Sequence, residues 1–129
     1  MNNKLFFGIP IVLIIALVGG GVYMIFFNKT ETVDSFKLTD YSDFIERFPS
    51  EKVLGSIDSA QTVKEKAETI WLDIYGDSVK DKKPYNVSFD EQNQVWLVQG
   101  TLQKNCDGGV PHILIQKSDG KVLAVWHDK

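Results

Sequence analysis

The chain has a single cysteine, Cys106, among its 129 residues. One thiol cannot form an internal disulfide, so the small disulfide-stapled scaffolds are excluded. The sequence also contains no CxxC or HxxxH pair, although its two histidines, His112 and His127, fall in neighbouring predicted strands. A zinc site normally needs three or four protein ligands. We therefore expect neither a metal nor any other cofactor.

Motifs for catalysis are equally scarce. Cys106 and His112 have no evident third group that would orient them as a nucleophile and its base. The Asp107-Gly108-Gly109 stretch lacks the GK[ST] sequence that follows a phosphate-binding loop. Asp73 and Tyr75, near the end of a predicted helix, are the remaining acid–base candidates, and we expect Asp73 to be solvated. The sequence predicts a protein that is not an enzyme and has no catalytic residues.

An excess of positive charge is also missing. All 17 acidic residues and 13 of the 14 basic residues lie from Asn28 onward, which gives this part a net charge of −4. Its only short basic cluster is Lys80, Lys82 and Lys83, which we interpret as a solvated loop. Nucleic-acid-binding domains concentrate positive charge on one face. No nucleic acid partner is expected.

What the chain does have is one long apolar run, Leu5 to Phe27, without Asp, Glu, Lys, Arg or His. As a helix it would span about 34 Å, enough for a bilayer core of about 30 Å. A cleaved signal peptide is the alternative, but its apolar stretch is usually shorter, about 7–15 residues. Cleavage near Gly19–Gly21 would leave an exposed VYMIFF terminus. We predict a single-pass transmembrane helix over 5–27 that inserts in the lipid bilayer.

The rest of the chain predicts two helices after a polar segment. Residues 28–39 contain few large apolar side chains and are interpreted as a stalk. A short helix is expected from Asp40 to Phe48 before Pro49. A longer one is expected from about Ser59 to Tyr75, capped by Asp58, with an apolar stripe along one face. The stripe consists of Ala60, Val63, Ala67, Ile70, Trp71 and Ile74.

Alternating apolar and polar residues then predict four strands, at 85–89, 95–102, 112–116 and 121–127. Short links favour an antiparallel meander. The expected fold class is α+β, with the long helix packed on a curved four-stranded antiparallel sheet. A sheet covered on one face leaves the other open, so Trp96 or Trp126 could be exposed there as part of a partner-binding patch.

A series of motifs in this part of the chain resembles a known family. IWLDIYG, KPYNVSF, VWLVQGTL, GGVPHILIQKSDGKVL and the closing HDK occur in that order over about residues 59–129. Together they resemble the NTF2-fold immunity proteins of bacterial polymorphic toxin systems. The resemblance implies an NTF2-like (cystatin-like) domain over 40–129. In the tail, Asp128 stands where the family pattern has glycine.

The resemblance also implies a function. It implies a protein that neutralises a cognate protein toxin by binding it. The apolar run, and not the resemblance, predicts anchoring in the bacterial cell membrane, and the four-residue leader before it favours a C-terminal domain outside the cytoplasm. Candidate partner-binding residues are the two tryptophans and one loop: Trp96, Trp126, Asn105, Cys106, Asp107, Gly108 and Gly109. Two alternatives remain at this point, a PepSY-like periplasmic regulatory module and a small-molecule-binding NTF2-like domain.

Overall fold

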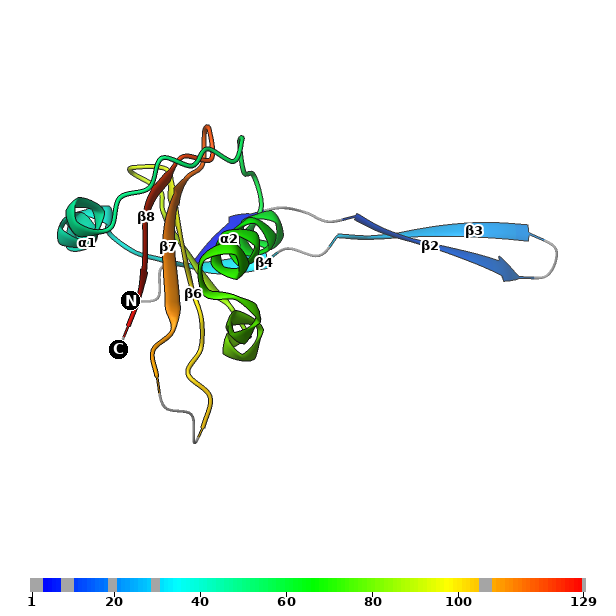
Figure 1. The fold of residues 1–129 in the computed structure, drawn as a ribbon. Coiled ribbons are helices and arrows are strands. Elements are labelled where there is room, and N and C mark those ends of the chain that lie inside the picture. Colours follow the sequence, from blue (N-terminus) through cyan, green and yellow to red (C-terminus); the bar gives the residue numbers. More distant parts are fainter. Residues whose placement is uncertain (1–3, 8–10, 19–20, 29–30, 105–107, 129) are drawn as a thin grey trace.

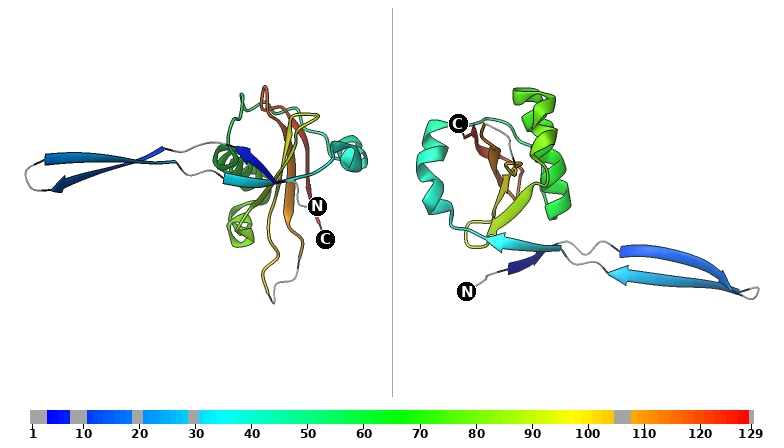
Figure 2. Two further views of the ribbon diagram at one scale, coloured as in Figure 1. Left: turned by 180° about the vertical axis from the view of Figure 1, so that it is seen from behind. Right: turned by 90° about the horizontal axis from the view of Figure 1, so that it is seen from below.

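A computed structural model describes residues 4–7, 11–18, 21–28, 31–104 and 108–128 of the chain. Its central element is a β-sheet with helices α1 (Ser42–Arg47) and α2 (Ala60–Tyr75) on opposite faces (Figure 1). The view from below in Figure 2 shows the same three layers, with the strands between the two helices. The mixed α+β class expected from the sequence is confirmed, but the sheet is covered on both faces.

Helix α2 forms where the apolar stripe was expected, with differences at its two ends. Its N-cap is Ser59 and not the predicted Asp58, because the Ser59 Oγ accepts the Thr62 backbone N–H at 3.1 Å. Gly76 ends the helix with a φ of +80°, a conformation that glycine adopts without strain. Ile74, predicted in the stripe, is 50% exposed, so the buried part of the stripe ends at Trp71.

The four predicted strands are present as β5 (Asn86–Asp90), β6 (Val95–Gln99), β7 (Pro111–Gln116) and β8 (Val122–His127). Each pairs antiparallel with the next, as the meander prediction required. The second strand is shorter than predicted and ends at Gln99. Gly100 then donates its N–H to the Pro111 carbonyl at 2.9 Å, and a Cβ on Gly100 would lie 2.8 Å from the Pro111 ring.

The expected strand count of four is wrong, and so is the expected stalk. Strand β4 (Glu31–Ser35) lies beside β5 in parallel, with Asp34 opposite Ser88, and β1 (Lys4–Phe7) pairs with β4, giving the order β1-β4-β5-β6-β7-β8. Val33 is only 3% exposed and joins the core under α2. Residues 28–39 carry a weak apolar pattern, so the backbone pairing that places β4 in the sheet has no clear sequence signal.

The predicted transmembrane helix over 5–27 is also wrong in the structure. Strands β2 (Ile11–Val18) and β3 (Gly21–Asn28) pair antiparallel as a separate two-stranded sheet. The many valines and isoleucines favour extended backbone, and glycine lowers helix propensity. Across the described ranges, no helix is both long enough and apolar enough to cross a membrane.

Two hydrophobic clusters lie on the two faces of the sheet. The first packs α2, including Val63, Ala67 and Trp71, against Trp96 and other side chains of the sheet. The second lies on the other face, where the 3₁₀ turn η1 (Leu38–Tyr41) and α1 cover part of β6, β7 and β8. The segment expected as a helix over 40–48 is thus a 3₁₀ turn followed by one α-helix, without a side-chain cap.

Candidate functional site

A groove of about 590 Å³ opens on the α1 face of the sheet, and we call it the His112 groove. Its aromatic lining residues are Phe36, Tyr41, Phe44 and Trp126. Its polar lining residues are Ser35, Lys37, Asp40, Gln99, His112 and Asp128. The segment around η1 and α1 forms one wall, and strands β6, β7 and β8 with the C-terminal tail form the other.

His112 lies at the centre of the second wall and is 7% exposed. The strand register places it between Gln99 on β6 and Trp126 on β8. Gln99 Nε2 and His112 Nδ1 are hydrogen-bonded at 2.9 Å, and His112 Nε2 donates to Asp128 Oδ2 at 2.7 Å. The imidazole also stacks on the Trp126 ring, with centroids 5.0 Å apart and planes 6° apart. These contacts fix the orientation of all three polar side chains.

The C-terminal tail is held in place by contacts on both sides of the sheet. The Asp128 N–H donates to the Val110 carbonyl at 3.2 Å, and the His127 ring lies 5.2 Å from the ring of Tyr75 on α2. Gly109 is buried against the tail, where a Cβ atom would collide with the Asp128 carbonyl group. The absence of a side chain at Gly109 therefore lets the tail bring Asp128 to His112.

The opposite wall presents aromatic rings beside an acidic group. Phe44 stacks on Trp126 with ring centroids 4.6 Å apart, and Tyr41 lies 5.9 Å from the same ring. Burial raises the pKa of the Tyr41 hydroxyl, and the neighbouring Asp40 carboxylate raises it further. Tyr41 is therefore neutral at physiological pH. Phe36, Tyr41 and Phe44 are each half-buried, so part of each ring remains accessible.

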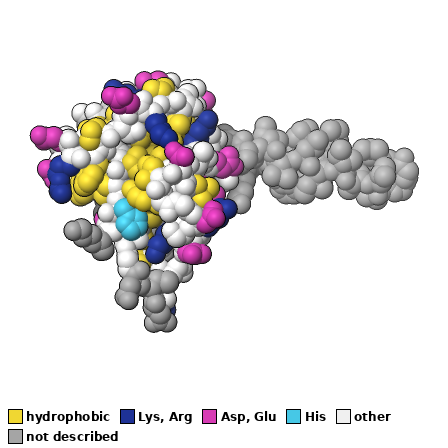
Figure 3. Space-filling model, viewed as in Figure 1, with side chains coloured by type: hydrophobic (Ala, Val, Ile, Leu, Met, Phe, Trp, Pro, Cys, Tyr) yellow, Lys and Arg dark blue, Asp and Glu magenta, His cyan; other side chains and the backbone are white. Residues whose placement is uncertain are grey.

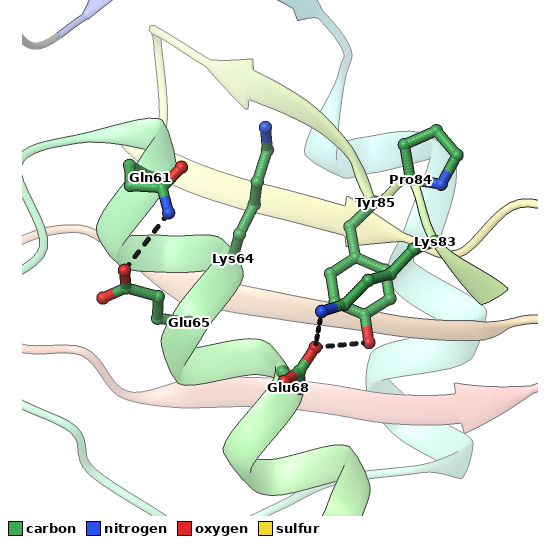
Figure 4. Close-up of a pocket in the computed structure, with 7 residues that line it drawn as sticks. All are labelled: Gln61, Lys64, Glu65, Glu68, Lys83, Pro84 and Tyr85. Atoms are coloured by element: carbon green, nitrogen blue, oxygen red, sulfur yellow. Dashed lines mark hydrogen bonds and ion pairs between the residues drawn. The ribbon is translucent and has the colours of Figure 1, made fainter. Parts of the chain in front are cut away.

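A second, smaller pocket of about 290 Å³ lies between α2 and the start of β5 (Figure 4). Glu68 is its central group, and it accepts hydrogen bonds from Tyr85 Oη at 2.7 Å and from Lys83 Nζ at 3.1 Å. The Tyr85 hydrogen bond, followed by the Lys83 contacts, lowers the pKa of Glu68 despite partial burial. Burial and the Glu68 carboxylate raise the pKa of Tyr85. These groups satisfy one another, which is typical of a structural network.

The structure places the predicted partner-binding tryptophans inside the protein. Trp96 is fully buried under α2 and donates its indole N–H to the Ile57 carbonyl at 3.0 Å. Trp126 is 5% exposed, because η1 and α1 cover the face that the sequence left open. Neither tryptophan is exposed, so of the two readings open from the sequence, an exposed patch or a completed core, both side chains follow the second. Trp126 still lines the His112 groove, as a buried support for the other rings.

The predicted loop divides between described and undescribed residues. Asn105, Cys106 and Asp107 lie outside the described residues. Gly108 is exposed, and Gly109 is the buried residue that contacts the tail. Sequence reasoning missed Gln99 and Asp40. Only the polar position of Gln99 in an otherwise buried strand could have indicated that residue.

The histidines considered as metal ligands, and Asp73 considered as an acid–base group, lie apart in the structure. His112 lies on the α1 face, whereas the His127 ring lies beside Tyr75 on the α2 side. Among the described residues, no three His, Cys, Asp or Glu side chains are grouped as a metal site would require. Asp73 is exposed and pairs with Lys52 at 3.1 Å, as expected for a solvated carboxylate.

The surface viewed in Figure 3 carries acidic and basic side chains intermixed with hydrophobic ones. Three large apolar side chains are at least half exposed, Val53, Ile74 and Leu102. They come from three separate segments of the chain. On the face seen in Figure 3, the acidic and basic side chains are interspersed.

Comparison with protein families gives a match to a family of immunity proteins. The model of the NTF2 fold immunity proteins, Imm-NTF2-2, matches residues 62–129, which is more than half of the chain. The chain belongs to this family. The match includes Gln99, His112 and Asp128, whereas Lys37, Asp40 and the aromatic residues of the opposite wall precede it. Searches of curated proteins and of solved structures returned no match.

Family membership confirms the resemblance drawn from the sequence motifs and favours it over a PepSY-like module. It supports a toxin-neutralising role in general, and the family is in general non-catalytic. The matched region begins at Thr62, in the first turns of α2, and continues through β8 to the end of the chain. The second wall of the groove is thus part of the family domain, and the first wall is built by the segment before it.

Proposed function

We propose that this protein neutralises a cognate bacterial toxin by binding it directly, without chemical turnover. The observation that carries the proposal is the match of residues 62–129 to the NTF2 fold immunity proteins. Inhibition by binding requires a complementary surface and no catalytic group. The negative charge from Asn28 onward would increase the rate of encounter with a basic toxin.

The test is co-expression with a bacterial toxin whose gene is found beside the gene of this protein. We expect the full chain to restore growth of cells that produce the toxin, and to co-purify with the toxin as a stoichiometric complex. The matched control is an unrelated NTF2-fold immunity protein, which should neither restore growth nor bind. Failure of the chain to bind the toxin, or chemical modification of the toxin by catalytic amounts of the chain, would contradict the proposal.

We also propose that residues 5–27 attach the protein to the bacterial cell membrane, with the C-terminal domain outside the cytoplasm. The absence of Asp, Glu, Lys, Arg and His from this run supports attachment. The anchor would place the domain where a toxin arrives from another cell.

Fractionation of cells that produce the full chain tests this location. We expect the protein to remain with membranes after alkaline washing, and added protease to digest the domain in spheroplasts without lysis. A chain beginning at Asn28 is the control and should be released. Recovery of the full chain in the soluble fraction would contradict attachment, and protection from the protease would contradict the orientation.

A further inference from the structure

We propose that the His112 groove receives an arginine side chain of the toxin. This inference rests on the proposed function and adds the chemistry by which the partner is recognised. It draws on the shape of the groove, the aromatic rings of its walls and the placement of its charges. The occupant would be a planar cation on a flexible stem.

The size and walls of the groove suit such a side chain. A volume of about 590 Å³ is ample for one long side chain with accompanying water. The half-buried rings of Phe36, Tyr41 and Phe44 offer apolar faces along one wall. Guanidinium groups stack on aromatic faces more readily than ammonium groups, because they are planar and more weakly hydrated.

The charges of the groove favour a cation over an anion. Asp40 and Asp128 bring carboxylates from the two opposite walls, and both residues are exposed to solvent. Lys37 is the lysine among the lining residues, and the His112 ring is already hydrogen-bonded to Gln99 and Asp128. An anion would therefore meet two carboxylates and one ammonium group. A guanidinium group can donate several hydrogen bonds to carboxylates at once.

The carboxylate of Asp128 is already oriented before a partner arrives. His112 donates to its Oδ2 at 2.7 Å, and Gln99 fixes His112 from the other side. The Asp128 side chain is still 51% exposed, so the carboxylate can accept further hydrogen bonds. A group that is held in its bound orientation loses little conformational entropy on binding. The chain Gln99–His112–Asp128 thus provides a preorganised acceptor.

Small probes test the groove without the toxin. The full chain, labelled with ¹⁵N, is titrated with N-acetyl-arginine-N-methylamide and with the matching lysine and citrulline compounds. Citrulline has nearly the shape of arginine but no charge. We expect saturable shifts of the Trp126 indole and neighbouring amides with the arginine compound, and affinity lower by about fivefold or more for the other two.

Charge variants give effects of opposite sign. Asp40→Asn should weaken binding of the arginine probe by about threefold or more, and Lys37→Met should strengthen it. Glu46→Gln makes the same charge change as Asp40→Asn on the neighbouring helix, outside the groove, and should leave affinity unchanged. Melting temperatures close to that of the unsubstituted chain would establish that the variants fold. Equal responses to arginine and citrulline, or equal effects of D40N and E46Q, would overturn the proposal.

The toxin then separates the two proposals. If the groove takes an arginine of the toxin, Asp40→Asn should weaken toxin binding by about threefold or more while Glu46→Gln has no effect. Toxin binding that is normal in D40N and K37M contradicts the assignment of the groove and leaves the proposed function standing. Absence of toxin binding by the unsubstituted chain contradicts the proposed function itself.

Discussion

Gly109 shows how one missing side chain positions the end of the chain. A Cβ atom there would collide with the Asp128 carbonyl group, so Gly109→Ala must displace either the loop or the tail. We expect a loss of about 1–3 kcal/mol in the free energy of unfolding, measured in urea. The His112 ring resonances should also change, because Asp128 is its hydrogen-bond partner.

The control for Gly109→Ala is the same substitution in a chain that ends at His127. Removing Asp128 removes the collision, so the substitution should cost much less in the shortened chain than in the full one. An equal cost in the two chains would show that the tail is not what constrains Gly109.

Tyr85 gives a second prediction at the scale of residues. Tyr85→Phe removes the donor to Glu68 and should cost about 1–2 kcal/mol in urea unfolding at pH 7. The pKa of Glu68 is lowered in the folded state from its ordinary 4.5, so its stabilisation is present above about pH 4.5 and is lost as the pH falls through the folded pKa. The difference in the free energy of unfolding between the native chain and Tyr85→Phe should therefore be smaller at pH 3 than at pH 7. A difference that stays constant from pH 7 to pH 3 would contradict the role of the Glu68 carboxylate.

Asp90 joins two elements that are far apart in the sequence. Its carboxylate accepts the N–H of Leu38 at 2.7 Å, at the start of η1, and two hydrogen bonds from Asn93 in the turn between β5 and β6. Burial by itself would raise the pKa of Asp90, but the hydrogen bonds from Asn93, Leu38 and Gln92 outweigh it and lower the pKa. The segment that forms the first wall of the His112 groove is thereby tied to the sheet.

Asp90→Asn should loosen this attachment, because an amide nitrogen cannot accept the hydrogen bonds that a carboxylate oxygen accepts. We expect a loss of about 2–3 kcal/mol in urea unfolding at pH 7, with faster amide hydrogen exchange in α1. The native Asp90 contribution is present above its ordinary pKa of 3.8 and is lost as the pH falls through its lowered folded pKa. Lowering the pH from 7 to below 4 should therefore reduce the free energy of unfolding less in the variant than in the native chain. Asp58→Asn, at an exposed position, is the control and should change stability little.

The net negative charge acts on the scale of the whole molecule. With −4 from Asn28 onward, association with a basic toxin should slow by about tenfold or more between low salt and about 0.5 M salt, because ions screen the attraction. Stopped-flow measurement of the association rate tests this, and the dissociation rate should change much less. A rate that is independent of salt would contradict electrostatic steering, without affecting binding itself.

The sequence by itself determined the parts of this protein that depend on local pattern. The stripe of α2 and the alternation in β5, β6, β7 and β8 are periodic, and each was predicted within a few residues. The motifs in the same region were sufficient to indicate the family that the comparison confirmed. The lack of periodicity explains why a helix was wrongly predicted over residues 5–27. A uniformly apolar run has no period that separates helix from strand.

Only the tertiary structure decided which segments of the chain pack against each other. β4 joins the sheet through backbone pairing, and η1 and α1 cover the second face, which buries Trp126 and makes a groove where an open face was expected. Gln99, His112 and Asp128 lie up to 29 positions apart in the sequence and meet only because β6 and β7 pair and the tail passes Gly109. Contacts between distant segments depend on how the faces pack, and a local pattern of apolar and polar residues does not specify that packing.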